Sequence, residues 1–284
     1  MITNLVKLIK FVWKHPSNKN DKFSAFLRIF RWQIASRLMP GYLAFPYYNK
    51  TYLLGKKGMT SASSAWYCGL YEFEEMSFLC DYLKNDDLFV DIGANIGAYS
   101  ILAASKGAKV IAIEPIPSTF KILKKNILFN NFESSVDVYN KAISDEKEKL
   151  NFSNNLDALN HVLIKSEHYP DIVNVSAIKL DEILNGRIPK FIKIDVEGFE
   201  TKVVNGAEKI FLNKDLKCVI IELIGGGKKY GFDENELHQK LLNFGFNTYS
   251  YIPSLKKLVS LNLKKNYQKN TIYLRKNFKE ENKI

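Results

Sequence analysis

Residues 88–97, Leu-Phe-Val-Asp-Ile-Gly-Ala-Asn-Ile-Gly, constrain the fold of this chain more than any other stretch. The apolar residues 88–90 predict a buried strand, and the loop after Asp91 leads into an apolar, helix-compatible segment at 99–104. A strand, a glycine loop and a helix in this order begin a βαβ unit that binds a nucleotide-like ligand. Gly93 permits a sharp turn, and Gly97 removes a side chain where a ligand or strand comes close.

The loop favours a cationic ligand over a dinucleotide. Its pattern is Asp-x-Gly-x-x-x-Gly, whereas a dinucleotide fingerprint brings three glycines and their amides to a pyrophosphate. The carboxylate of Asp91 would repel a pyrophosphate but suits a ligand with an amino group, such as S-adenosylmethionine (AdoMet). Glu114 follows Asp91 by 23 residues, close to the roughly 20 expected for an acid that binds ribose hydroxyls. The alternative is an ordinary turn of a Rossmann-like domain.

From residue 86 onward, strands and helices alternate. Strands are expected at 87–91, 109–114, 136–140, 190–195 and 217–223, with helices at 118–130, 201–211 and 235–244. This alternation predicts a parallel sheet with helices on both faces. Four strands end in an acid, namely Asp91, Glu114, Asp195 and Glu222. Because ligands of open α/β sheets bind outside the carboxyl ends of the strands, these acids mark the candidate site.

Composition restricts the class of partner and the redox environment. The chain has 284 residues and a net charge of +11, which fits an anionic partner such as polysaccharide, nucleic acid or lipid head groups, or a lysine-rich background. No named nucleic-acid motif accompanies the charge. Cys68, Cys80 and Cys218 are widely spaced, which argues against a disulfide framework or a zinc site and favours a reducing cytosol.

The sequence predicts three regions. Residues 1–65 form a basic extension with helices over 1–13 and 23–32, which either caps the substrate side, packs on the protein or lies on an anionic membrane surface. Residues 66–276 form the main domain, and residues 277–284 a charged, frayed tail. Within the main domain we expect an insertion at 144–189, a glycine hinge at 225–227, and a hairpin-like pair at 246–252 and 270–275 that closes the sheet edge.

The motifs together resemble the FkbM family of AdoMet-dependent methyltransferases. The resemblance covers about residues 65–225, and its specific part is the pair Asp-Ile-Gly-Ala-Asn-Ile-Gly at 91–97 and Lys-Ile-Asp-Val-Glu-Gly at 193–198. Supporting matches are Gly-Leu-Tyr-Glu at 69–72, Glu-Pro at 114–115, Ala-Ile-Ser-Asp at 142–145 and Leu-Asp-Glu at 180–182. The resemblance implies an α/β, class I methyltransferase Rossmann-like fold, with a mostly parallel seven-stranded sheet and an antiparallel strand near the C-terminus.

The resemblance also implies methyl transfer from AdoMet to a hydroxyl, often on a sugar. The cofactor-binding candidates are Asp91, Gly93, Ala94, Asn95, Gly97, Glu114, Pro115, Lys141, Ala142, Asp195 and, from the start of the helix at 73–83, Glu72. A hydroxyl is a poor nucleophile, so a general base is expected among Asp195, Glu197, Glu222 and His161. Asp195 and Glu222 could together hold a divalent ion, but nothing in the spacing demands one, and no metal is predicted.

These observations predict a cytoplasmic O-methyltransferase in polysaccharide, glycolipid or related glycoconjugate synthesis, peripheral to the inner face of a membrane. One alternative keeps methyl transfer but takes a small metabolite, a protein or nucleic acid as acceptor. Another is a Rossmann-like nucleotide-binding module or a dehydrogenase without methyl transfer, against which the missing third glycine counts.

Overall fold

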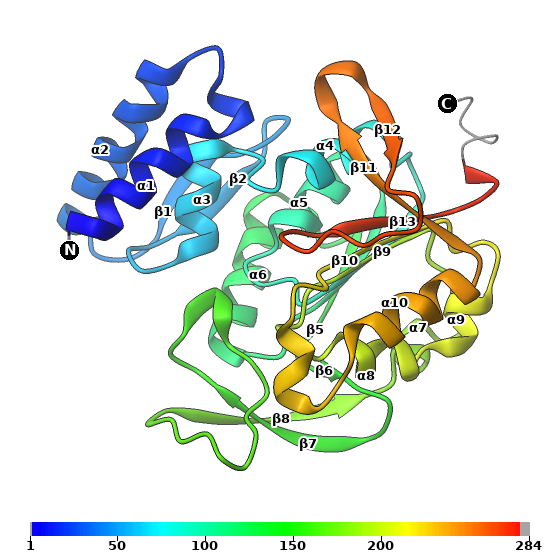
Figure 1. The fold of residues 1–284 in the computed structure, drawn as a ribbon. Coiled ribbons are helices and arrows are strands. Elements are labelled where there is room, and N and C mark those ends of the chain that lie inside the picture. Colours follow the sequence, from blue (N-terminus) through cyan, green and yellow to red (C-terminus); the bar gives the residue numbers. More distant parts are fainter. Residues whose placement is uncertain (1, 279–284) are drawn as a thin grey trace.

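The computed structural model describes residues 2–278, with side chains from residue 6 onward (Figure 1). The predicted tail at 277–284 therefore lies largely outside the described residues. Strands and helices alternate through the middle of the chain, as the apolar periodicity predicts.

The main sheet has eight strands in the order β12-β11-β13-β10-β9-β3-β4-β5. Five neighbours, β10, β9, β3, β4 and β5, run parallel, and β13 pairs antiparallel with both β10 and β11. This is the predicted class I methyltransferase arrangement, to which β12 adds an edge strand. The bounds are β3 Leu88–Ile92, β4 Lys109–Ile113, β5 Val136–Tyr139, β9 Phe191–Ile194, β10 Cys218–Ile221, β11 Phe246–Ile252, β12 Lys257–Ser260 and β13 Thr271–Arg275.

Alternate residues of each central strand enter different hydrophobic cores, as the two-residue period of a strand requires. Phe89 and Phe191 belong to one core, and Val90 and Ile192 belong to the other. The first core also contains side chains of α4 Phe73–Tyr82, α5 Ala98–Ser105 and α6 Pro117–Phe129. The second contains those of α7 Leu180–Leu184, α8 Glu200–Asn205, α9 Glu208–Leu212 and α10 Glu234–Asn243. Helices therefore cover both faces of the sheet, as predicted.

The N-terminal segment folds against the first core. It comprises α1 Ile2–Lys14, η1 Pro16–Asn18, α2 Lys22–Leu38, the hairpin β1 Leu43–Pro46 with β2 Tyr52–Gly55, and α3 Thr60–Cys68. Trp32 lies 5.9 Å from Phe45 and 5.8 Å from Trp66, centroid to centroid, so helices and hairpin share one aromatic cluster. The boundary predicted at residue 65 falls inside α3.

The predicted insertion folds as a second sheet in the order β6-β8-β7. Its strands are β6 Ala142–Ile143, β7 Glu148–Ser153 and β8 Ile172–Ile178, and η2 Asp157–Leu159 lies in the loop between β7 and β8. Figure 1 shows β7 and β8 of this second sheet below the main sheet.

Three predictions about local structure are wrong. The single helix expected at 201–211 is split into α8 and α9 around Gly206, where a Cβ would lie 2.1 Å from the Ser144 carbonyl oxygen. The glycine hinge at 225–227 is largely the start of a 3₁₀ helix, η3 Gly226–Tyr230. The predicted pairing of β11 with β13 is confirmed, but β11 turns through η4 Pro253–Leu255 into β12, so that β12 and not β13 lies at the sheet edge.

The three cysteines are free and buried. Among the described residues, no helix combines the length and apolar character needed to cross a bilayer.

Candidate active site

A cavity of about 270 Å³ opens at the carboxyl ends of β3, β4, β9 and β10. Its position follows from the parallel sheet, because loops diverge where the strand order reverses beside β3. The predicted site residues that line it are Glu72, Gly93, Ala94, Asn95, Glu114, Pro115, Lys141, Ala142, Asp195, Glu197 and Glu222. The cavity thus collects residues from six separate stretches of the chain.

Two predicted ligand residues, Asp91 and Gly97, support the cavity without lining it. Asp91 is fully buried; its Oδ2 accepts a hydrogen bond from the Ser100 hydroxyl at 2.6 Å, while its Oδ1 has no partner. Gly97 directly precedes α5 and has a φ of 92°, and a Cβ there would lie 2.6 Å from Leu123. Gly97 therefore permits the close packing of α5 on α6.

Gly93 keeps the loop after β3 close to the end of β9. Its φ is 79°, and a Cβ would lie 1.8 Å from the Asp195 carbonyl oxygen. No other residue type fits there without moving one of the two loops that bound the cavity. The glycine at position 93, which the sequence analysis attributes to a sharp turn, is thus also required by close packing against the loop after β9.

The Glu114 carboxylate fixes the loop across from it. Its two oxygens accept the backbone amides of Asn95 and Ile116, each at 2.9 Å. Burial raises the pKa of Glu114 to about 7 despite these hydrogen bonds. Asn140 donates to the carbonyl oxygens of Glu114 and Pro115 at 2.9 and 2.8 Å, which sets the turn that brings Lys141 and Ala142 to the cavity.

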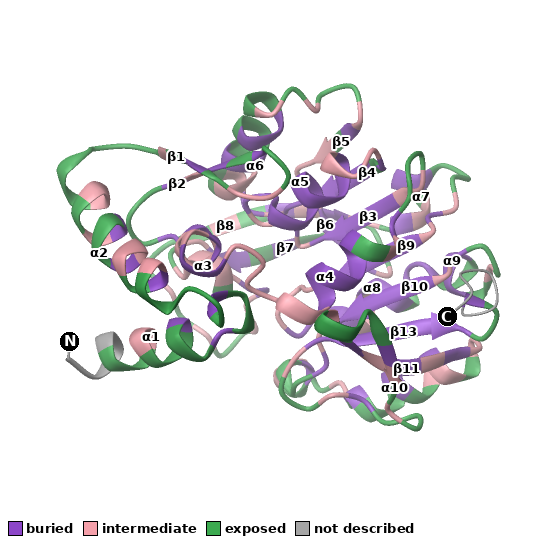
Figure 2. Ribbon diagram, turned by 90° about the horizontal axis from the view of Figure 1, so that it is seen from above, coloured by how far each residue is buried: buried purple, intermediate pink, exposed green. Residues whose placement is uncertain are grey.

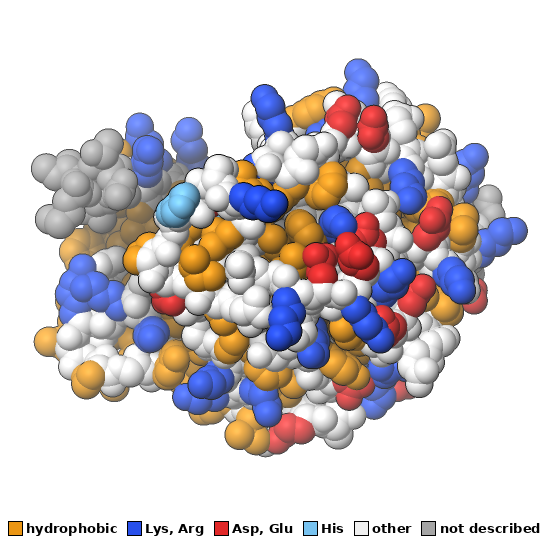
Figure 3. Space-filling model, turned by 90° about the horizontal axis from the view of Figure 1, so that it is seen from below, with side chains coloured by type: hydrophobic (Ala, Val, Ile, Leu, Met, Phe, Trp, Pro, Cys, Tyr) orange, Lys and Arg blue, Asp and Glu red, His pale blue; other side chains and the backbone are white. Residues whose placement is uncertain are grey.

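The cavity holds more acid than base. Two lysines line it, Lys141 and the buried Lys193, against six acids: Glu72, Glu114, Asp157, Asp195, Glu197 and Glu222. Burial, and next the repulsion of the Asp195 carboxylate, raise the pKa of Glu197 to about 7 and that of Glu222 to about 8. Seen from below, acidic side chains gather near the middle of the face, with lysine and arginine side chains around them (Figure 3).

Lys193 belongs to the motif at 193–198 and lines the cavity, although no role for it was predicted from the sequence. Its ammonium lies 2.9 Å from Asp195 Oδ2 and 4.8 Å from the centre of the Tyr99 ring. Burial opposes its charge, but the carboxylates of Asp195, Glu72 and Asp91 outweigh that effect and raise its pKa. The signal for it was present in the sequence, since a lysine inside the apolar run 191–194 must be paired when buried.

Glu72 is connected to the same group of side chains. Its Oε2 accepts from the Tyr99 hydroxyl at 2.6 Å and from Asn270 at 2.7 Å. Burial raises the pKa of Glu72, whereas the nearby Lys193 ammonium lowers it. A side chain before α4 is thereby joined to α5 and to the loop before β13.

Glu197 is held in an unusual backbone conformation. Its φ is 55° and that of Gly198 is 100°. Glu200 stabilises this turn, because its Oε1 accepts the amides of Val196 at 3.1 Å and Gly198 at 3.2 Å. Non-glycine residues at positive φ are uncommon and gather at functional sites.

His161 does not line the cavity, although its neighbours Asn160 and Val162 do. Its Nδ1 lies 2.9 Å from the Leu159 carbonyl oxygen and its Nε2 lies 3.1 Å from Glu167 Oε1. Both ring nitrogens are occupied, so the structure places His161 in the framework of the inserted sheet. It is not brought together with the other three candidate bases.

The mouth of the cavity is built from α3 and η2, which no sequence motif marked. Thr60, Ser61 and Ser64 of α3 line it on one side, and Asp157 and Ala158 of η2 on the other. The amide of Thr60 donates to Asp157 Oδ2 at 2.5 Å, which joins the N-terminal segment to the insertion. Both predicted accessory regions therefore contribute to the site.

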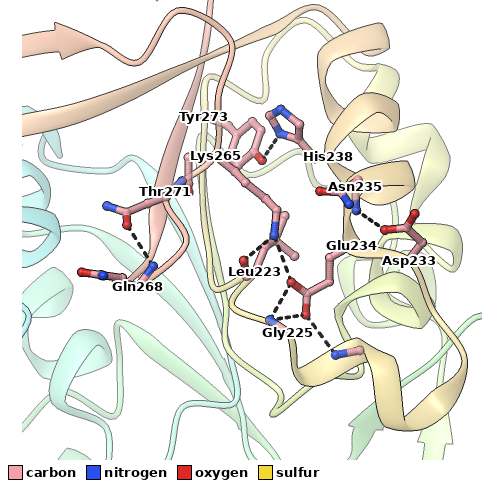
Figure 4. Close-up of polar contacts among 12 residues, drawn as sticks. Leu223, Gly225, Asp233, Glu234, Asn235, His238, Lys265, Gln268, Thr271 and Tyr273 are labelled. Atoms are coloured by element: carbon pink, nitrogen blue, oxygen red, sulfur yellow. Dashed lines mark hydrogen bonds and ion pairs between the residues drawn. The ribbon is translucent and has the colours of Figure 1, made fainter.

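A buried ion pair holds the loop after Glu222 (Figure 4). The Glu234 carboxylate accepts the amides of Gly225 and Gly227 and lies 3.2 Å from the Lys265 ammonium. Lys265 also donates to the Leu223 carbonyl oxygen at 2.8 Å. In this loop Gly226 packs directly on Gly198, so the ends of β9 and β10 are fixed against one another.

The described residues contain one group of three acids close enough to share a cation, Asp145, Glu146 and Glu148. This group lies outside the cavity.

Comparison with known proteins identifies the family. The family model described as the methyltransferase FkbM domain matches residues 91–248, more than half of the chain. The chain belongs to the FkbM methyltransferase domain family. The resemblance drawn from the motifs at 91–97 and 193–198 is confirmed, and residues of both motifs line the cavity of this FkbM-family protein.

Three similar proteins place the family match in context. Hexuronic acid methyltransferase AglP of Haloferax volcanii is 28% identical over 158 residues, which are 55% of this chain and 63% of AglP. The tRNA(Phe) (4-demethylwyosine(37)-C(7)) aminocarboxypropyltransferase of Pyrococcus horikoshii is 50% identical over 58 residues, 20% of this chain and 21% of that protein. The solved structure of P. horikoshii TYW2 in complex with MeSAdo has a TM-score of 0.39 and 18% identity, and the match covers 83% of this chain and 70% of that chain. The matches thus span less than two thirds of either curated relative.

Proposed function

We propose that this protein transfers a methyl group from AdoMet to a hydroxyl oxygen of a sugar in a polysaccharide, glycolipid or related glycoconjugate. The observation that carries the proposal is the excess of carboxylates that face one cavity in a chain of the FkbM family. A cavity lined by six carboxyl groups and two lysines favours a cationic ligand over NAD or another anionic nucleotide.

The residues present fit AdoMet. Asp91 is buried two residues before Gly93, and its Oδ1 has no hydrogen-bond partner, so a buried acceptor remains free for a donor. In the proposal Gly93, Ala94 and Asn95 hold the methionine part, Glu114 the ribose, and Pro115, Lys141 and Ala142 the base. The carboxylates of Glu72 and Asp195, which both line the cavity, neutralise the positive charge of AdoMet in this proposal.

When bound, AdoMet supplies a methyl group attached to a positively charged sulfur. The work left to the protein is to orient the hydroxyl and remove its proton. Lys193 fixes the orientation of the Asp195 carboxylate through their 2.9 Å contact, so that Asp195 can accept a hydrogen bond from the hydroxyl. Glu197, with its pKa near 7, is better matched to the role of general base at neutral pH.

The acceptor enters beside α3 and η2 in this proposal. Their hydroxyl, amide and carboxylate groups, from Thr60, Ser61, Ser64, Asp157 and Asn160, are the groups that recognise sugar hydroxyls. AglP is by name a hexuronic acid methyltransferase, which supports a sugar as the acceptor class. Bases of nucleic acid are the weaker alternative, because none of these five residues is aromatic and could stack on a base.

Calorimetric titration with AdoMet, S-adenosylhomocysteine and NAD tests the cofactor. We expect the first two to bind and NAD not to bind. Asp91→Asn and Glu114→Gln should weaken binding by tenfold or more, while Glu146→Gln, an exposed acid outside the cavity, should leave it unchanged. Binding of NAD in preference to AdoMet would refute the proposal.

Incubation with methyl-labelled AdoMet and a panel of glycans and glycolipids tests the acceptor. A labelled product that survives mild alkali is a methyl ether and supports transfer to a hydroxyl, whereas an alkali-labile ester indicates transfer to a uronic acid carboxyl. Mass spectrometry separates both from transfer of an aminocarboxypropyl group, the reaction named for the P. horikoshii relative. Labelling of RNA or protein alone would overturn the assignment of a sugar acceptor.

A further inference from the structure

The helix α2 is apolar on the side that faces away from the protein. Phe23, Phe26, Phe30, Ile34 and Leu38 follow one another at steps of three or four residues, so they form one stripe along the helix; we call them the α2 stripe. Their exposed fractions run from 37% to 75%. Ala25, Ile29 and Trp32, on the opposite side, are buried in the core. The packing of α2 on the protein therefore leaves the stripe uncovered.

Both ribbon views place α2 at one end of the molecule, opposite the C-terminal strands (Figures 1 and 2). The exposed residues of α1 and α2 lie along this end in Figure 2. α1 continues the same surface, because the Lys22 ammonium at the start of α2 lies 4.7 Å from the centre of the exposed Trp13 ring. Val12 of α1 is buried, so α1 itself packs on the protein. The sequence-based prediction of a membrane-facing helix thus applies better to α2 than to α1.

The charge around the stripe is almost all positive. Residues 1–38 contain eight lysines and arginines and one acid, Asp21, and so carry +7 of the net charge of +11. Arg28 is used internally, where it donates to the Tyr67 carbonyl oxygen and to Asn18. The remaining basic residues are exposed: Lys7, Lys10, Lys14, Lys19, Lys22, Arg31 and Arg37.

We infer that the α2 stripe and its basic surroundings bind the surface of an anionic lipid bilayer. Aromatic and aliphatic side chains would enter the interface between head groups and acyl chains, while the lysines and arginines contact anionic head groups. A second copy of this chain fits the same surface poorly, because two segments of +7 would face one another. Nucleic acid would pair with the lysines but would leave Ile34 and Leu38 in water.

Co-sedimentation with lipid vesicles tests the inference, and it needs neither cofactor nor turnover. We expect the protein to bind vesicles of phosphatidylcholine mixed with phosphatidylglycerol, and not vesicles of phosphatidylcholine alone. Binding should weaken as salt is raised, because the head-group contacts are screened. Absence of binding to both kinds of vesicle would overturn the inference.

Matched variants locate the surface. Phe30→Ser with Ile34→Ser, and separately Lys10→Glu with Lys14→Glu, should each reduce vesicle binding by about tenfold or more. Leu212→Ser with Leu255→Ser, and Lys214→Glu with Lys257→Glu, change equally exposed residues elsewhere and should leave it unchanged. Circular dichroism checks that each variant is folded.

The same variants distinguish a lipid bilayer from the two other possible partners of this surface, a second copy of the chain and nucleic acid. If the stripe variant, Phe30→Ser with Ile34→Ser, binds vesicles as well as the unaltered protein, this assignment of the surface is overturned. A concentration-dependent dimer in light scattering that the stripe variant dissociates while vesicles do not bind would overturn it as well. A third outcome is that the protein binds an RNA duplex but no vesicles, and that Lys10→Glu with Lys14→Glu weakens this binding while the stripe variant does not. That outcome would favour nucleic acid and refute the inference.

Discussion

At the scale of single residues, the carboxylate proposed as the general base should determine the pH dependence of the reaction. Because burial and the Asp195 carboxylate raise the pKa of Glu197 to about 7, the base is protonated at acidic pH. We expect kcat to rise about tenfold per pH unit below pH 7 and to level off above it. Glu197→Gln should lower kcat by 10²- to 10⁴-fold, the usual contribution of a general base, and leave AdoMet affinity nearly unchanged.

The competing base is Glu222, whose pKa burial raises to about 8. Glu222→Gln therefore makes the matched comparison, measured over the same pH range. Glu222 is the general base if the unaltered protein reaches its plateau near pH 8, Glu197→Gln keeps this pH profile, and Glu222→Gln flattens it. The exposed Glu146→Gln controls for a general effect of charge on the rate.

At the scale of elements, the loop between β10 and α10 depends on one buried ion pair. Glu234 and Lys265 are each less than a tenth exposed, and the Glu234 carboxylate also accepts amides of the glycine loop. Lys265→Met leaves the carboxylate without its cation, and Glu234→Gln leaves the ammonium without its anion. Each should lower the free energy of unfolding by about 3 kcal/mol in urea denaturation. The double variant Glu234→Gln with Lys265→Met should lose less than the sum of the two, because no unpaired charge remains. Additive losses would contradict a direct coupling between these side chains.

The sequence predicted the elements whose cause is local, and it missed contacts that only packing creates. Apolar runs that end in Glu114, Asp195 and Glu222 sufficed to place these acids at one edge of the sheet, since parallel strands share their direction. The requirement for glycine at position 206 could not be predicted, because it reflects the close approach of the Ser144 carbonyl oxygen, more than 60 residues away.

Asp91 and Gly97 show a second limit of the motif. Their spacing correctly located the loop, but the motif does not distinguish residues that face the cavity from those that support it. α3 reaches the mouth because Trp66 packs on Trp32, a contact that no periodicity encodes. Both cases concern side-chain direction after folding, which depends on tertiary contacts.

At the scale of the whole molecule, the N-terminal segment and the sheet share one hydrophobic core. Trp32 of α2 is 3% exposed and belongs to the same buried cluster as Phe89 and Phe191 of the main sheet. Trp32→Ala should therefore lower the free energy of unfolding by about 3–5 kcal/mol and shift a single calorimetric transition of the entire chain downward. It should also weaken acceptor binding, because Trp32 supports α3 through Trp66 and α3 forms one wall of the cavity mouth. Phe30→Ser, two residues away on the exposed side of the same helix, should leave both the transition and the acceptor affinity nearly unchanged. Two transitions, of which Trp32→Ala moves only one, would instead establish residues 1–65 as a separate domain that rests on an independently stable methyltransferase fold.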